Sequence, residues 1–226
     1  MIRALLFDFD GLIIDTETPD YVTWRQVYQE HGADLPLETW ADAIGRRVAD
    51  LFDPISHLES LIGRRVDRQA IQERQRALSD ALIAQQPILP GVLEAITTAR
   101  RLGLKLAVAS SSDYAWVGGH LTRLGLIGHF DAICTADDVV HAKPAPDLFL
   151  AALAALDVPA DQAVVLEDSP NGITAANRAG IFVVAIPNQT TARLKLDHAN
   201  LILSSLAELP LERLLERIAT RQDGGQ

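Results

Sequence analysis

ALLFDFDGLIIDTE, residues 4–17, joins a short apolar run to two aspartates placed one residue apart. The run from Ala4 to Phe7 is typical of a buried strand, and Asp8, Asp10 and Gly11 follow where it ends. Two carboxylates this close repel each other unless a positive charge lies beside them. The stretch therefore predicts a strand whose carboxyl end carries a charged functional site.

The composition is that of an ordinary globular protein with an acidic surface. The 226 residues are 48% hydrophobic and 22% charged, and the formal net charge is −10. Nucleic-acid binders carry a basic patch, whereas the arginines here are scattered, so we expect no nucleic-acid partner. Cys134 is the single cysteine, which excludes an internal disulfide and favours a reducing compartment.

Nothing in the sequence indicates a membrane or a secretion route. No apolar run is as long as a bilayer-spanning helix. Asp8 and Asp10 interrupt the N-terminal apolar stretch too early for the core of a signal peptide. We therefore expect a cytoplasmic protein with no membrane partner, and because no feature demands a second subunit, we expect a monomer.

The chain divides into a helical block and an alternating block. Residues 16–84 show helical spacing of apolar positions in four segments and no convincing strand. From residue 85 onward, short apolar runs at 104–109, 130–136, 162–167 and 180–186 alternate with amphipathic segments. This alternation predicts an α/β fold with a parallel sheet covered on both faces. Residues 1–15 and 85–226 would form the core, and residues 16–84 an insert.

Residues that can carry chemistry follow each of four apolar runs. In an open parallel sheet all carboxyl ends lie along one edge, where ligands bind, so these residues should meet there. Carboxylates, hydroxyls and a lysine gathered at one edge predict a site for a divalent cation and a phosphate group. The residues are Asp8 and Asp10, Ser110 to Ser112, Asp137, Asp138 and Lys143, and Glu167 and Asp168.

The residue types suit phosphoryl transfer. Oxygen-only ligands suit Mg²⁺, and Asp8 could then attack phosphorus to form an aspartyl phosphate while Asp10 acts as general acid and base. Lys143 would supply positive charge and Ser110 a hydroxyl, and Gly11 would let the backbone turn close to the phosphate. Each residue alone also has a structural reading, since an aspartate can form a turn and SSSD can cap a helix. The joint pattern favours the catalytic reading.

Four motifs carry a resemblance to a known family. DFDGLIIDTE, ASSS, AKPAPDLF and LEDSPNG together resemble the haloacid dehalogenase superfamily, in its branch of sugar-phosphate phosphatases and β-phosphoglucomutases. The resemblance implies a Rossmann-like sheet of strand order 5-4-1-2-3 with an inserted helical cap that closes over the substrate. It also implies Asp8 as nucleophile, Asp10 as general acid and base, and Ser110 and Lys143 as phosphate binders. Mg²⁺ would be held by Asp8, the backbone carbonyl of Asp10, and Asp168, with Glu167 beside it.

The substrate is less clearly indicated than the chemistry. We expect a Mg²⁺-dependent phosphatase acting on a small phosphorylated sugar or polyol. The alternative is a sugar phosphomutase, but in that register the mutases have a histidine at position 20, where this chain has Asp20, and a cap arginine slightly later than the arginines here. Candidate phosphate- and substrate-binding residues are Gly11, Asp20, Trp24, Gly45, Arg46, Arg47, Ser110, Ser111, Ser112 and Lys143.

Two further alternatives are more distant. A metal-free haloacid dehalogenase would use the same nucleophile on carbon, but it has no use for Asp10 or for Mg²⁺. A catalytically silent binding protein on this fold is also conceivable, because a fold does not fix a function. Such a protein would be expected to have lost one of the chemical residues, and Asp8, Asp10, Lys143 and Asp168 are all present.

Overall fold

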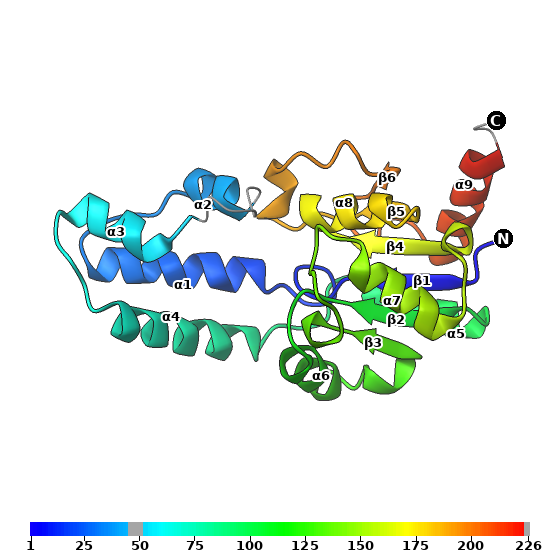
Figure 1. The fold of residues 1–226 in the computed structure, drawn as a ribbon, viewed down its shortest axis with the longest axis horizontal. Coiled ribbons are helices and arrows are strands. Elements are labelled where there is room, and N and C mark those ends of the chain that lie inside the picture. The colour runs from blue at the N-terminus through cyan, green and yellow to red at the C-terminus, as the bar shows by residue number, and fades with distance from the viewer. Residues whose placement is uncertain (45–51, 224–226) are drawn as a thin grey trace.

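The computed structural model describes residues 1–44 and 52–223, and a parallel sheet of six strands forms its centre (Figure 1). The strand order is β3-β2-β1-β4-β5-β6, so the predicted order 5-4-1-2-3 is right for five strands but lacks β6 at the edge. This strand is only two residues long, too short for a recognisable pattern. The strands are β1 (Ala4–Phe7), β2 (Lys105–Ala109), β3 (Ala132–Cys134), β4 (Ala163–Glu167), β5 (Phe182–Ala185) and β6 (Leu201–Ile202).

Strand β1 lies inside the sheet, between β2 and β4. Its four side chains are fully buried, with Leu5 and Phe7 in the apolar cluster on one face and Ala4 and Leu6 in the cluster on the other. Side chains alternate between the two faces of a strand, and both faces here are covered by helices. This double burial explains why the strand reads as a continuous apolar run.

Helices cover both faces of the sheet. The first face packs against α5 (Val92–Arg101), α6 (Tyr114–Arg123) and α9 (Leu211–Asp223), and the second against α7 (Asp147–Leu156) and α8 (Pro170–Arg178). The predicted α/β class is therefore confirmed. The helix expected after SSSD is α6, whereas α9 was not predicted as an element from the sequence, although it packs three buried apolar residues on the sheet: Leu211, Leu214 and Ile218.

Four of the described helices lie beyond the carboxyl edge of the sheet (Figure 1). They are α1 (Glu17–Glu30), α2 (Leu37–Ile44), α3 (Pro54–Ile62) and α4 (Arg68–Ile83), and α1 and α4 run side by side. These helices share an apolar cluster of their own, which includes Val27, Tyr28 and Leu58, whereas Ile83 at the end of α4 packs into the sheet's first cluster. The domain boundaries at residues 16 and 84 stay a prediction.

The described α-helices are short, with 8 to 16 residues each. Helix α4 is the longest of those described, and it buries Ile71 and Ile83 while its charged residues are exposed. Within residues 1–44 and 52–223, no helix combines the length and the apolar character that crossing a bilayer requires.

Candidate active site

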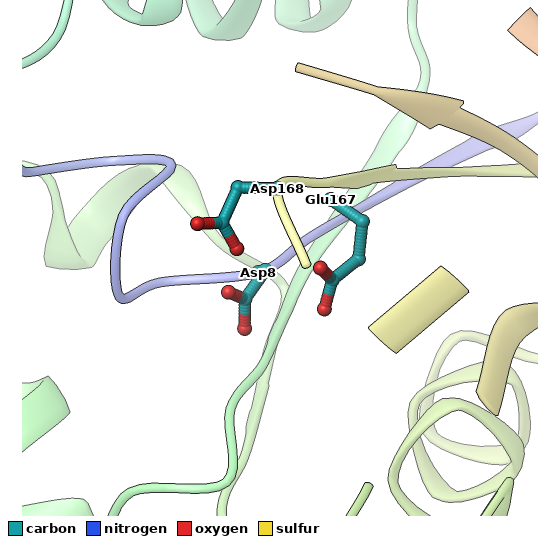
Figure 2. Close-up of side chains that lie close together, drawn as sticks. All are labelled: Asp8, Glu167 and Asp168. Carbon is teal, nitrogen blue, oxygen red and sulfur yellow. The ribbon is translucent and has the colours of Figure 1, made fainter. Parts of the chain in front are cut away.

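Three carboxyl groups lie close together where β1 and β4 end. Asp8 follows β1, Glu167 is the last residue of β4 and Asp168 follows it, and Figure 2 shows the three side chains grouped at this edge. One carboxylate oxygen from each lies within 4.8 Å of the other two. The residues are buried, with 7%, 0% and 2% of their surfaces exposed, respectively. The strand-end rule used on the sequence therefore brought these three residues together correctly.

Lys143 lies between two of these carboxylates. Its Nζ donates to Asp8 Oδ1 at 2.6 Å and to Glu167 Oε1 at 2.8 Å, and its side chain is 6% exposed. The ammonium group also lies 4.9 Å from the centre of the Phe149 ring, close enough for a cation–π interaction. The Lys143–Pro144 peptide bond is cis. One lysine thus supplies positive charge at the point where the sequence predicted it.

The net negative charge of this cluster favours the binding of a divalent cation. Burial, then the Glu167 and Asp10 carboxylates, raise the pKa of Asp8 to about 8, although Lys143 opposes the shift. Burial and the neighbouring carboxylates of Glu167 and Asp8 also raise the pKa of Asp168 well above its ordinary value. A single ammonium therefore does not balance the charge of the ionised cluster. An oxygen-only donor set with excess negative charge fits Mg²⁺.

Glu167 is held by the start of α8. Its Oε2 accepts hydrogen bonds from the Ser169 backbone N–H at 2.8 Å and from the Ser169 hydroxyl at 3.0 Å. Ser169 also caps the helix, because its Oγ accepts from the Gly172 N–H at 3.1 Å. The LEDSPNG motif therefore orients a buried carboxylate and begins a helix with the same serine.

Asn188 is a residue of this site that the sequence analysis missed. Its amide Nδ2 donates to Asp168 Oδ2 at 2.8 Å and to the Gly11 carbonyl at 3.3 Å. Its Oδ1 accepts from the backbone N–H groups of Thr190 and Thr191, which fixes the amide's orientation. Asn188 follows β5, so the strand-end rule could have found it.

The side chain of Asp10 is held by the segment after β2. Its Oδ2 accepts from the Ser112 hydroxyl at 2.6 Å and from the Ser110 hydroxyl at 3.3 Å, and its Oδ1 accepts from the Trp116 indole N–H at 2.9 Å. Ser110 and Ser112 were predicted as phosphate binders, and the structure places their hydroxyls on the second aspartate. Trp116 was not predicted, because no strand-end pattern reaches into the helix that carries it.

A cleft of about 1000 Å³ opens beside the carboxylates, between the sheet edge and helices α1 and α4. Asp20 and Trp24 line it from α1, and Ser110, Ser111 and Ser112 line it from the sheet. These residues are therefore brought together as predicted. Gly11 is not part of this lining and lies against Asp168 and Asn188. The predicted Gly45, Arg46 and Arg47 lie outside the described residues.

The cleft also has polar and aromatic lining that the sequence analysis did not identify. Gln75 on α4 donates from Nε2 to Asp20 Oδ1 at 2.6 Å and to Thr23 Oγ1 at 3.1 Å. Trp40 and Phe52 add aromatic surface to that of Trp24. The Trp40 indole N–H is buried and has no hydrogen-bond partner in the described part of the chain. The cleft can therefore pack against the ring faces of a ligand and form hydrogen bonds with its hydroxyl groups.

Comparisons with known proteins agree with this geometry. Residues 5–186 match the family of haloacid dehalogenase-like hydrolases. A Bacillus subtilis (strain 168) protein named "Putative phosphatase YhcW" is 41% identical over 218 residues, which cover 96% of this chain and 98% of that protein. Hexitol phosphatase B of Escherichia coli (strain K12) is 33% identical, with 95% of this chain and 97% of that protein covered.

A solved structure shares the fold. It is a crystal structure of mutant CbbY from Rhodobacter sphaeroides in complex with xylulose-(1,5)bisphosphate, with a TM-score of 0.73 and 29% identity over 92% of this chain and 96% of that one. The match of the family over most of the sheet, together with relatives named as phosphatases, confirms the resemblance carried by the four motifs. The chain belongs to the haloacid dehalogenase-like hydrolase family, and it is a phosphoric monoester hydrolase.

Proposed function

We propose that this phosphatase depends on Mg²⁺ and hydrolyses a small phosphorylated sugar or polyol through an aspartyl phosphate on Asp8. The observation that carries the proposal is the group of three buried carboxylates within 4.8 Å of one another, with Lys143 bonded to two of them. A nucleophile, a positive charge and a cation-binding oxygen set are thereby adjacent at the floor of one cleft.

Asp8 acts as the nucleophile. Lys143 occupies its Oδ1, which leaves Oδ2 as the oxygen that attacks phosphorus. As the Oδ2–phosphorus bond forms, the bond between phosphorus and the sugar oxygen breaks. The ammonium of Lys143 stabilises the negative charge on the transferring phosphoryl group, which is the main demand of this chemistry.

Asp10 transfers the proton in both halves of the reaction. Protonated Asp10 donates its proton to the departing sugar oxygen, so the sugar leaves as a neutral alcohol. The resulting carboxylate then accepts a proton from the water that attacks the aspartyl phosphate, and inorganic phosphate and free Asp8 are formed. The side chain lies in the lining of the same cleft as Asp8 and Lys143.

The residues proposed to hold Mg²⁺ are Asp8, Asp168 and the backbone carbonyl of Asp10, with Glu167 beside them. Bound Mg²⁺ supplies positive charge that offsets that of the carboxylates and of the phosphoryl oxygens. Glu167 orients Lys143 and is itself held by Ser169, so its main contribution is to fix the position of the ammonium.

The lining of the cleft supports a sugar or polyol as the group that leaves. Aromatic faces from Trp24 and Trp40 can cover a sugar ring, and Asp20 and Ser112 can exchange hydrogen bonds with its hydroxyls. A hexitol phosphatase among the relatives and a sugar bisphosphate bound to a structural neighbour agree with this class. All proposed site residues belong to one chain, so a monomer suffices, and the single buried thiol of Cys134 suits a cytoplasmic location.

The test is a phosphatase screen over sugar, polyol and short-acid phosphates, with Mg²⁺ and after its removal by EDTA. Phosphate release should require Mg²⁺ and should disappear in Asp8→Asn, while Asp161→Asn, which changes an exposed aspartate outside the cleft lining, should keep the wild-type rate. A crystal soaked with beryllium fluoride should show it bonded to Asp8. Substantial turnover by Asp8→Asn protein would refute the mechanism.

The same assay separates the phosphatase from the mutase. With β-glucose 1-phosphate and a trace of the bisphosphate, a phosphatase releases inorganic phosphate because water attacks the aspartyl phosphate. A mutase instead accumulates glucose 6-phosphate, because a sugar hydroxyl attacks. Asp20, bound to Gln75 at the position where the mutases have a histidine, favours the first outcome.

A further inference from the structure

The indole of Trp116 reaches across the cleft edge to the second aspartate. Trp116 lies in the first turn of α6, and its Nε1 donates to Asp10 Oδ1 at 2.9 Å. Helix α6 fixes the start of this side chain, because Asp113 caps the helix by accepting from the Trp116 backbone N–H at 2.8 Å. The indole ring also packs edge-on against His120, with ring centres 4.5 Å apart.

The two oxygens of Asp10 have partners of different chemical character. An indole N–H can only donate a hydrogen bond, so the oxygen facing it must act as an acceptor. A serine hydroxyl can donate or accept, so Ser112 can stay bonded to Asp10 Oδ2 whether or not that oxygen carries a proton. The asymmetry favours Oδ2 over Oδ1 as the oxygen that carries the proton, because the Ser112 hydroxyl can adjust to a proton on Oδ2 whereas the Trp116 N–H cannot adjust to one on Oδ1.

We propose that Trp116 is a positioning residue for Asp10, fixing Oδ1 as an acceptor so that Oδ2 is the atom that gives the proton to the leaving oxygen and later takes one from water. This inference rests on the proposed function, in which Asp10 is the general acid and base. In the first half-reaction the Oδ2–H bond breaks, the proton joins the departing sugar oxygen and the bond to phosphorus breaks. In the second, Oδ2 regains a proton from the attacking water.

The consequence of losing this contact depends on the leaving group. Without the indole N–H, the Asp10 carboxyl can rotate and present its proton away from the departing oxygen. A sugar alkoxide is strongly basic and cannot leave without that proton, whereas p-nitrophenolate is weakly basic and leaves without help. A residue that acts only through Asp10 should therefore affect the two substrates to different degrees.

The experiment compares kcat/KM for sorbitol 6-phosphate and p-nitrophenyl phosphate in Trp116→Phe, which keeps an aromatic ring against His120 but removes the N–H. This parameter includes only the steps up to departure of the leaving group, so the later hydrolysis of the aspartyl phosphate does not mask the effect. We expect a loss of about tenfold for sorbitol 6-phosphate and less than about twofold for p-nitrophenyl phosphate, since correctly placed acid catalysis contributes 10²–10⁴-fold. Tyr114→Phe, which removes a hydroxyl from an exposed ring on α6, should leave both values unchanged.

The ratio of the two values is independent of how much of the variant is folded, because both substrates report on the same folded fraction. If Trp116→Phe does not fold, the same ratio can be measured in Trp116→Leu, which also lacks the N–H. Equal losses on both substrates, or no loss on either, would show that Trp116 has only a structural role and would overturn the proposal.

A double-mutant cycle with Asp10→Asn supplies the second readout. If Trp116 acts through Asp10, Trp116→Phe should change kcat/KM for sorbitol 6-phosphate by less than about twofold once the acid is absent, because effects on one chain of contacts are not additive. A full tenfold loss in that background would overturn the proposal. If Asp10→Asn keeps the wild-type ratio of kcat/KM between the two substrates, the proposed role of Asp10 as general acid is wrong. If Asp10→Asn changes this ratio but Trp116→Phe does not, only the inference about Trp116 is overturned.

Discussion

Gly172 and Glu167 lie so close together that no side chain fits between them. A Cβ built on Gly172 would lie 1.5 Å from Glu167 Oε1 and 1.8 Å from Cδ, and the carboxylate is completely buried. Since Glu167 bonds to both Lys143 and Ser169, it cannot move aside without losing these contacts. The glycine that ends the LEDSPNG motif is therefore required because a buried carboxylate occupies the space where a side chain would lie.

Gly172→Ala should destabilise the protein through this crowding. Overpacking a well-filled interior costs about 1–3 kcal/mol, and we expect a loss of about 3 kcal/mol because the displaced group is a buried, hydrogen-bonded carboxylate. The measurement is the free energy of unfolding in urea. Gly119→Ala is the matched control on α6, with nothing within 4 Å of the new Cβ, and it should stabilise by about 0.5–1 kcal/mol. Equal free energies for both variants would contradict the prediction.

Gly11→Ala should combine backbone strain with crowding of the proposed metal site. Gly11 has a φ of +79°, and a Cβ there would lie 2.4 Å from Asp168 Oδ2 and 2.7 Å from Asn188 Nδ2. Gly32 has the same φ of +79° and open space around it, so Gly32→Ala isolates the cost of strain, about 1 kcal/mol. Urea unfolding should show a clearly larger loss for Gly11→Ala. A loss no greater than that of Gly32→Ala would mean that the contact with Asp168 imposes no constraint.

The sequence predicted the site best where a functional residue directly follows a buried strand. Asp8 and Asp168 each follow a run of apolar residues whose side chains fill both faces of the sheet, so the position of the strand end could be predicted directly. The parallel arrangement then placed these ends together, because adjacent strands in one sheet share an edge. Asn188 obeys the same rule after β5, but a neutral amide in a loop also reads as an ordinary turn residue.

Contacts made by helices could not be predicted in this way. The bond from Trp116 to Asp10 joins residues 106 positions apart, and it depends on the direction in which α6 leaves the sheet. The bond from Gln75 to Asp20 depends likewise on how α1 and α4 pack together. A helix pattern specifies which face is buried, but not which residue on another helix that face will meet.

Asn188→Ala should weaken the binding of Mg²⁺. Its amide is the group that orients Asp168 through Oδ2, and loss of an orienting partner behind a metal ligand typically lowers affinity 10–100-fold, so we expect about tenfold. Isothermal titration calorimetry with Mg²⁺ alone measures this without any turnover. Asn177→Ala removes a comparable side-chain hydrogen bond, from the Asn177 amide to the His198 carbonyl, and this variant should bind Mg²⁺ with wild-type affinity. Unchanged affinity in Asn188→Ala would show that Asp168 is oriented without the amide.

Lys143→Met should destabilise the fold as well as abolish turnover. The lysine side chain is 6% exposed and bonds two buried carboxylates, so its removal takes the positive charge away from buried negative charge. Breaking a buried ion pair from one side costs about 3–5 kcal/mol, which urea unfolding in the presence of EDTA can measure. Lys195→Met changes an exposed lysine, and its free energy of unfolding should stay within about 0.5 kcal/mol of wild type. A Lys143→Met protein as stable as Lys195→Met would show that Lys143 serves catalysis alone.

Asp131 should make the stability of the sheet depend on pH. Its Oδ2 accepts from the Leu106 backbone N–H at 2.8 Å and from Arg100 Nη1 at 2.7 Å, next to the start of β3. Partial burial alone would raise the pKa of Asp131, but the Leu106 N–H and Arg100 outweigh it and hold this pKa below its ordinary 3.8. The unfolded chain therefore binds a proton here at a higher pH than the folded one. The contribution is fully present above about pH 5 and is lost as the pH falls through 3.8 toward the folded pKa.

Asp131→Asn should accordingly be less stable than wild type at neutral pH, because a neutral amide oxygen is a weaker acceptor for the guanidinium of Arg100. The gap in the free energy of unfolding should narrow as the pH falls below about 4, where the wild-type carboxylate begins to lose its charge. Urea titrations at about pH 7, 5 and 3.5 measure this gap directly, and subtraction of the two proteins removes the effect of every other carboxylate. Asp161→Asn, at an exposed position, should follow the wild-type pH dependence. If this difference in the free energy of unfolding stays constant from pH 7 to 3.5, the charge on Asp131 contributes nothing to the stability of the protein.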